Sequence, residues 1–135
     1  EFVLKHNLKH VIFTGHINGI EKHNCFQNAD ILFFPSCYSE GLPCVIMEAM
    51  LYGLPVVTRP IVGIPEWVKH YENGWLSEST DPIAFSKGIM TLVSKPQLLQ
   101  IISENNKRTA NTFFTPEAFK NQLNHIYKII LYESC

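Results

Sequence analysis

The stretch that decides the fold is DILFFPSCYSEGLPCVIMEAMLYGLPVVT, which covers residues 30–58. Near its start, the run 31–34 is apolar without a break, and the run 54–58 at its end finishes in three β-branched residues. Such runs are typical of strands covered on both faces, as in parallel sheets. Between them, residues 44–52 carry apolar side chains at helical spacing and stop at Gly53. The stretch therefore predicts a strand, a helix and a strand of a parallel α/β sheet.

The same alternation extends to both sides of this stretch. Upstream, the sequence predicts a buried strand at 11–15 and a weak helix at 21–29. Downstream, it predicts a short helix at 66–70 and a strand at 75–77. The remaining residues predict three helices that each begin at a proline, at 82–93, 96–113 and from 116 onward. We therefore expect a Rossmann-like parallel sheet followed by C-terminal helices.

The composition indicates one folded domain and argues against several functions. The chain has 135 residues, of which 46% are hydrophobic and 17% charged, and its formal net charge is −1. The apolar fraction is sufficient for a packed core, and the charge density is too low for a disordered chain. Because no basic surplus is available to neutralise phosphates, we do not expect nucleic acid as a partner.

No segment indicates a membrane span, a signal peptide or a metal site. The apolar runs stop well short of the roughly 20 residues of a span, and the N-terminus lacks a basic region that leads into an apolar one. His6 and His10 are spaced as neighbours on a helix, but no glutamate accompanies them, so we expect a solvated surface. The chain has four cysteines, Cys25, Cys37, Cys44 and Cys135. They form no Cys-x-x-Cys pair, so we expect free thiols in a reducing cytoplasm.

The residues with the most chemical content stand between the first and second strand of the deciding stretch. The N-terminus of the helix offers unpaired N–H groups, which suit a phosphate, and Gly41 would let a ligand approach the backbone closely. Glu40 precedes the helix, and Glu48 lies about one and a half turns inside it. Carboxylates accept hydrogen bonds from paired sugar hydroxyls, so a nucleotide-sugar would fit this layout. The structural alternative is that Glu40 only complements the helix dipole and that Glu48 is solvated or salt-bridged.

At this point the sequence resembles the GT-B-fold family of retaining nucleotide-sugar glycosyltransferases, specifically its glycosyltransferase 4-like group. The hallmark of that group is two glutamates separated by seven residues, which Glu40 and Glu48 match. The resemblance covers about residues 8–135. Further matching segments are VIFTGH (11–16), ADILFFPS (29–36), EAMLYGLPVV (48–57), GIPE (63–66) and ENGWL (72–76).

The resemblance implies a role for each matching residue. Glu40 would contact the donor sugar as the catalytic residue, and the backbone at Gly41, Leu42 and Pro43 would face the sugar and the diphosphate. Val45 would lie near the diphosphate or ribose, and Glu48 would accept the ribose hydroxyls. No metal or other cofactor is implied, because the donor itself is the only small molecule and the chain has no Asp-x-Asp motif.

The sequence departs from the family in the loop that precedes Gly63. Residues 59–62 read RPIV, where the family usually has an acidic residue and a second glycine. We expect Arg59 to be solvated, with contact to a phosphate as the alternative. For Trp67 and Trp75, burial against the sheet is favoured over stacking on a sugar.

The resemblance also implies that residues 1–135 are part of a C-terminal donor-binding domain. In the family, an arginine and a lysine on a loop after the first strand also hold the diphosphate, and this chain begins beyond that loop. If the sheet follows the order 3-2-1-4-5-6, strands 1 and 2 are absent, and the strand at 31–34 presents an apolar open edge. Such an edge invites pairing, so association of two copies is one expectation. We expect residues 1–135 alone to bind donor weakly and to catalyse no transfer.

The main functional hypothesis is a cytoplasmic enzyme that transfers a hexosyl-type sugar to a glycan or lipid acceptor with retention. A peripheral position at the inner membrane face is part of the same hypothesis. The acceptor would bind through an N-terminal domain. A non-catalytic nucleotide-binding module on the same sheet is the first alternative. A glycosidase that uses Glu40 and Glu48 as an acid/base pair is a weaker one, because these residues flank a helix N-terminus and not a sugar-binding cleft.

Overall fold

The computed structural model describes residues 1–39 and 41–132, and its centre is a three-stranded parallel sheet. The strands are β1 (Leu32–Phe34), β2 (Val56–Thr58) and β3 (Gly74–Leu76), in the order β1-β2-β3. The register pairs Phe33 with Val57 and Val57 with Trp75. The parallel α/β sheet predicted from the deciding stretch is therefore confirmed.

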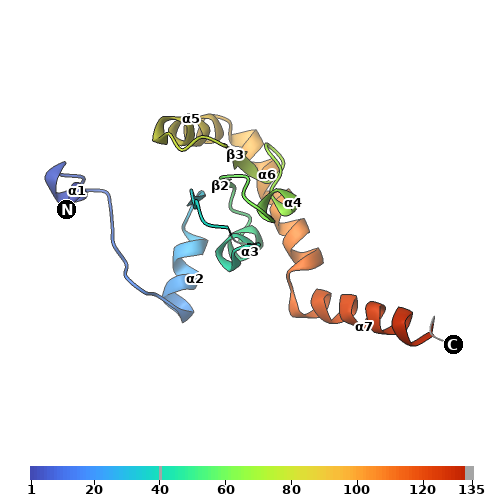
Figure 1. The fold of residues 1–135 in the computed structure, drawn as a ribbon. Helices are drawn as coiled ribbons and strands as arrows, with labels where there is room; N and C mark the ends of the chain where they lie inside the picture. Colours follow the sequence, from blue (N-terminus) through green and yellow to red (C-terminus); the bar gives the residue numbers. More distant parts are fainter. Residues whose placement is uncertain (40, 133–135) are drawn as a thin grey trace.

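Helices connect and cover the strands (Figure 1). α3 (Cys44–Leu51) leads from β1 to β2, and α4 (Ile64–Trp67) leads from β2 to β3. The prolines predicted to open the later helices do so. The remaining helices are α1 (Phe2–Lys5), α2 (Gly19–Gln27), α5 (Pro82–Val93), α6 (Pro96–Phe113) and α7 (Pro116–Tyr132).

The strands separate two apolar layers because successive side chains of a strand point to opposite faces. On one face, Val56 packs with buried residues of α3 and α4 and with Ala110 of α6. On the other face, Val57 packs with Phe85 and Leu92 of α5 and with Ile102 of α6. The sheet is therefore covered on both sides, which explains why its strands read as unbroken apolar runs.

The strand predicted at 11–15 is wrong. This segment has no regular secondary structure and runs as an extended trace between α1 and α2, away from the sheet (Figure 1). The exposed fractions of Val11, Ile12 and Phe13 are 45%, 83% and 80%. A strand is stable only when a neighbour accepts and donates its backbone hydrogen bonds, and no such neighbour lies beside this segment in the described part of the chain.

The other differences from the sequence prediction are small. The third strand begins at Gly74, one residue earlier than expected, and α4 begins at Ile64 where 66–70 was expected. The single turn of α1 has no counterpart in the prediction. Boundaries of this kind depend on caps and tertiary contacts more than on apolar spacing.

The outer side of β1 carries no strand among residues 1–39 and 41–132, so the predicted open edge is present. At the other end of the molecule, α7 projects from the body beyond α6 (Figure 1). No described helix combines the length and the apolar character required to cross a bilayer. Association through the open edge stays a prediction.

Candidate functional site

The candidate site lies where β1 and β2 reach their carboxyl ends, which is where ligands bind in open α/β sheets. The Thr58 hydroxyl donates a hydrogen bond of 2.6 Å to the carbonyl oxygen of Phe34 and so holds the two strand ends together. A Cβ added to Gly63 would lie only 2.6 Å from the carbonyl oxygen of Gly41. The loop after β2 therefore passes directly against the loop after β1, and only glycine permits this approach.

The N-terminus of α3 opens onto the same edge. Pro43 is its N-cap and contributes no side-chain hydrogen bond, so the N–H groups of the first turn are not capped by a side chain. Nothing within 4 Å would meet a Cβ added to Gly41, so the space in front of its backbone is open. This arrangement can accept an anion at the positive end of the helix dipole.

Glu48 lies four residues after Cys44, about 6 Å further along the axis of α3. Its side chain is 37% exposed, and its Oε1 accepts a hydrogen bond of 2.6 Å from Nζ of Lys22 on α2. Glu48 is therefore salt-bridged, as the structural alternative predicted. The described residues offer no partner to the second carboxylate oxygen, Oε2, which leaves it able to accept hydrogen bonds.

The other predicted site residues differ in how far they are buried and in what they contact. Pro43 is buried, and the partly buried side chains of Leu42 and Val45 pack against the core on the α3 side of the sheet. Val45 also lines an apolar hollow with residues of α2. The catalytic role predicted for Glu40 concerns a residue that lies outside the described residues, so that role stays a prediction.

Val62 lies in the loop before Gly63, where the sequence departs from the family pattern, and has a backbone conformation that suits glycine. Its φ is 45°, in the left-handed region that a β-branched residue rarely adopts. A backbone of this kind costs on the order of 1–3 kcal/mol when the residue is not glycine. The loop therefore keeps a conformation that suits glycine although valine stands there.

Arg59 is not a solvated arginine, contrary to expectation. The residue is half-buried, and its Nη1 and Nη2 donate hydrogen bonds to Cys37 Sγ at 3.1 Å and to the carbonyl oxygen of Glu78 at 3.2 Å. Its Nε is buried and has no hydrogen-bond partner. Arg59 is half-buried because the chain that follows β3 returns and places Glu78 beside the end of β2. The sequence around Arg59 gives no sign of this contact.

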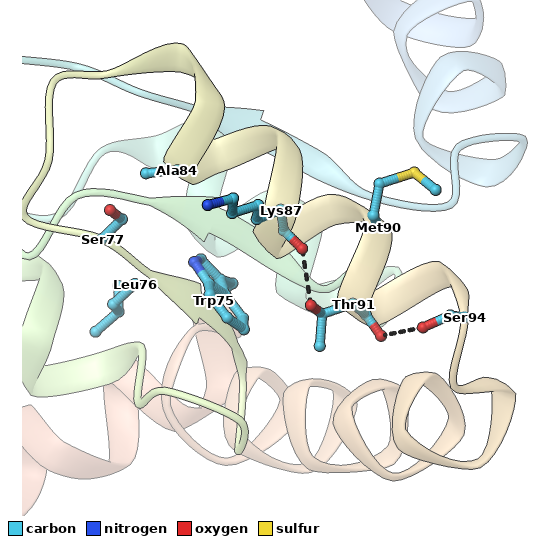
Figure 2. Close-up of a pocket in the computed structure, with 8 residues that line it drawn as sticks. All are labelled: Trp75, Leu76, Ser77, Ala84, Lys87, Met90, Thr91 and Ser94. Carbon is cyan, nitrogen blue, oxygen red and sulfur yellow. Dashed lines mark hydrogen bonds between the residues drawn. The ribbon is translucent and has the colours of Figure 1, made fainter.

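Trp67 and Trp75 are both partly buried, but burial with the sheet, which the sequence favoured for both, is seen for Trp75 of β3. Trp75 packs against the α5 side of the core, and Trp67 makes edge contacts with Phe113 and Phe114. Trp75 also lines a hollow of about 780 Å³ between β3 and α5, shown in Figure 2. There, the hydroxyls of Thr91 and Ser94 donate to helix carbonyl oxygens.

The cysteines and histidines form no cluster in the part of the chain that the structure describes. Cys25, Cys37 and Cys44 are exposed free thiols, whereas Cys135 lies outside the described residues. No group of three or more His, Cys, Asp or Glu residues that could hold a metal ion occurs among residues 1–39 and 41–132.

Sequence reasoning missed two contributors to the candidate site. Lys22 lies on a helix that was predicted only weakly, and no local signal connects it with Glu48. Thr58 was identified only as a strand residue, although a hydroxyl at a buried strand end is a signal that it bonds a neighbouring strand.

The chain was compared with known families and structures. The model of the family "Glycosyl transferases group 1" matches residues 1–109. A relative is the capsular polysaccharide biosynthesis glycosyltransferase CapM of Staphylococcus aureus, 25% identical over 124 residues, which are 92% of this chain and 32% of the relative. The chain spans about a third of the length of the curated relatives that it matches.

Two solved structures share the fold along almost the whole chain. Sucrose-phosphate synthase from Thermosynechococcus elongatus superposes with a TM-score of 0.83 at 26% identity, covering 98% of this chain and 33% of that one. HepE of Anabaena, in complex with UDP and glucose, gives a TM-score of 0.81 at 25% identity, covering 93% of this chain and 34% of that one.

Proposed function

Because the chain belongs to the glycosyl transferases group 1 family, we propose that it forms the donor-binding part of a glycosyltransferase. In this proposal, a nucleoside diphosphate sugar binds at the carboxyl edge of the sheet. The observation that carries it is the meeting of Gly41 and Gly63 in front of the uncapped N-terminus of α3. The complex of HepE with UDP and glucose supports the same class of ligand, since that protein shares this fold.

Each part of the candidate site has a role in the proposal. The diphosphate lies at the N-terminus of α3, where backbone N–H groups and the helix dipole stabilise negative charge. The open space before Gly41 admits the ligand close to the backbone. Glu48 accepts hydrogen bonds from the ribose hydroxyls, and Glu40 contacts the donor sugar.

The proposed reaction moves the sugar from the diphosphate to an acceptor hydroxyl with retention of configuration. The bond between the anomeric carbon and the diphosphate oxygen breaks, and the diphosphate keeps the electron pair. A bond from the acceptor oxygen to the anomeric carbon forms, and the proton of the acceptor hydroxyl passes to an oxygen of the departing diphosphate. The helix N-terminus would favour this step because negative charge grows on the departing diphosphate.

The wider features of the enzyme are part of the proposal. A hexosyl donor, a glycan or lipid acceptor bound by an N-terminal domain, and a cytoplasmic location at the inner membrane face stay predictions. So does the absence of a metal or other cofactor. Relatives such as CapM, named for capsular polysaccharide biosynthesis, support a glycan product.

A non-catalytic nucleotide-binding module would use the same helix N-terminus and remains the alternative. It differs from the enzyme in one measurable respect, since it would bind UDP and UDP-sugars equally and contribute no group to the sugar. A glycosidase is disfavoured because Glu48 lies on α3, close to a helix N-terminus that suits a diphosphate, and not in a sugar-binding cleft.

The proposal is tested by titrating UDP, GDP and ADP and their glucose conjugates into the protein, followed by NMR chemical shifts because weak binding is expected. We expect one nucleoside diphosphate to bind, with shifts at the N-terminus of α3. Glu48→Ala should raise the Kd about tenfold, because one hydrogen bond to a charged group contributes about that factor to binding. The matched control is Glu117→Ala, which removes another lysine-paired glutamate on α7. Equal binding by both variants would overturn the role of Glu48, and no binding by the unaltered protein would overturn the function.

A further inference from the structure

We propose that Lys22 is a positioning residue, which fixes the Glu48 carboxylate so that its second oxygen accepts the ribose hydroxyls of the donor. The inference rests on the proposed function and adds a residue from α2 to it. Lys22 lies inside the family match over residues 1–109 but in none of the short matching segments named above.

The contact between the two side chains is short and spans 26 positions in the sequence. Nζ of Lys22 lies 2.6 Å from Oε1 of Glu48, and the two side chains are 39% and 37% exposed. Charge-assisted hydrogen bonds of this length are among the stronger ones in proteins, and partial burial limits their screening by salt. The contact therefore restricts the orientation of the carboxylate.

Lys22 can act in this way because α2 is itself held against α3. The rings of Phe26 and Tyr52 stack with centroids 5.2 Å apart and an interplanar angle of 11°. His23 Nδ1 and Tyr52 Oη are joined by a hydrogen bond of 2.6 Å. Lys22 Nζ also lies 6.0 Å from the centroid of the Phe26 ring. These contacts fix the helix from which Lys22 reaches Glu48.

The same residues border two hollows, so the pair is reachable by a ligand. One hollow, of about 270 Å³, is lined by Lys22, Glu48 and Tyr52 among others. The second, of about 310 Å³, is lined mainly by apolar residues and includes Lys22 and Val45. A carboxylate at this position has space beside it for hydroxyl groups.

The pairing has a defined chemical consequence for Glu48. With Oε1 engaged by Lys22, Oε2 is presented in one orientation and needs no reordering when a hydroxyl arrives. A carboxylate that rotates freely would lose that freedom on binding and so bind more weakly. Lys22 therefore acts on the ribose through Glu48, without touching the ligand.

Two other roles for Lys22 make different predictions. If Lys22 bound a phosphate of the ligand directly, its loss would weaken every nucleoside diphosphate equally. If it only joined α2 to α3, its loss would lower stability and affect all ligands alike. Only a positioning role changes how much the ribose hydroxyls contribute to the binding free energy.

The experiment compares the nucleoside diphosphate bound most tightly among UDP, GDP and ADP with its 2′,3′-dideoxy form. The measured quantity is the ratio of the two Kd values, obtained by NMR titration for each variant. In the unaltered protein we expect the Kd of the dideoxy form to be about ten times higher or more, because this form lacks the hydroxyls that donate hydrogen bonds to the charged carboxylate. In Glu48→Ala the ratio should fall to about one, and in Lys22→Met to roughly three, whereas Lys22→Arg should restore most of it.

The control is Lys120→Met, which removes the exposed lysine paired with Glu117 at 3.9 Å and should leave the ratio unchanged. An unchanged ratio in Lys22→Met would overturn the inference, whether or not both Kd values rise together. If Glu48→Ala also kept the full ratio, the ribose role in the proposed function would fail as well. The two failures are therefore distinguishable.

Discussion

Asn106 on α6 is the buried polar residue whose replacement should cost the most stability. It is 0% exposed. Its Nδ2 donates to the carbonyl oxygens of Leu54 at 2.8 Å and Asn73 at 3.0 Å, and its Oδ1 accepts from Asn73 Nδ2 at 2.8 Å. Because Leu54 precedes β2 and Asn73 precedes β3, one side chain joins the amino ends of two strands to α6. The perturbation is Asn106→Leu, which keeps the size and removes the hydrogen bonds.

The expected loss follows from these three bonds. Two groups are left without a partner, the carbonyl oxygen of Leu54 and Nδ2 of Asn73, at about 2 kcal/mol each. The carbonyl oxygen of Asn73 keeps a hydrogen bond of 3.1 Å from the N–H of Val56. The burial of the leucine side chain returns about 2 kcal/mol. The free energy of unfolding should therefore fall by roughly 2 kcal/mol, and Tm by about 8 °C for a chain of this length.

The assay is urea denaturation followed by tryptophan fluorescence, since Trp67 and Trp75 both lie in packed surroundings. The control is Asn111→Leu on the same helix, where an exposed amide donates to the carbonyl oxygen of Lys107 at 2.8 Å. This variant should stay within about 0.5 kcal/mol of the unaltered protein. If Asn106→Leu were as stable as this control, the hydrogen-bond reasoning would be refuted.

Three further predictions concern glycines. Gly63→Ala should lower the free energy of unfolding by about 1–3 kcal/mol, because its Cβ would lie 2.6 Å from the carbonyl oxygen of Gly41. Gly41→Ala meets no atom within 4 Å, so it should keep the stability but weaken nucleoside diphosphate binding about tenfold; unchanged binding in a titration would contradict the open approach. Gly88→Ala should lower the free energy of unfolding by about 1–2 kcal/mol, since its Cβ would lie 2.6 Å from the ring of Trp75. A higher Tm, as helix propensity alone predicts, would show that α5 can move away from the ring.

Much of the fold could be predicted from short stretches of sequence. The runs 31–34 and 54–58 became β1 and β2 because their apolar character suits a sheet covered on both faces. Proline and Asp81 located the start of α5, where the Asp81 side chain accepts from the N–H of Ile83 at 2.9 Å. The run 11–15 is also apolar and β-branched, yet it forms no strand. Its local sequence favours a strand but does not place a second strand beside it to share backbone hydrogen bonds.

The candidate site was only partly predictable. The spacing around Gly41 indicated a helix N-terminus at the end of a strand, and the structure places it there. The surroundings of Glu48 and Arg59 were not visible, because Lys22 approaches from an earlier helix and Glu78 from a later loop. A solvated arginine was therefore the wrong expectation for a half-buried guanidinium group.

The sequence by itself determined the three strands of the sheet, their parallel arrangement and the helices from α2 onward, since apolar spacing, prolines and helix stops act between residues a few positions apart. Only the tertiary structure decided which distant groups meet. The pair Lys22–Glu48 spans 26 positions, and the bond from Asn106 to Leu54 spans 52. The physical reason is that such contacts depend on how helices dock on the sheet, and docking is the sum of many weak packing contacts that no single stretch encodes.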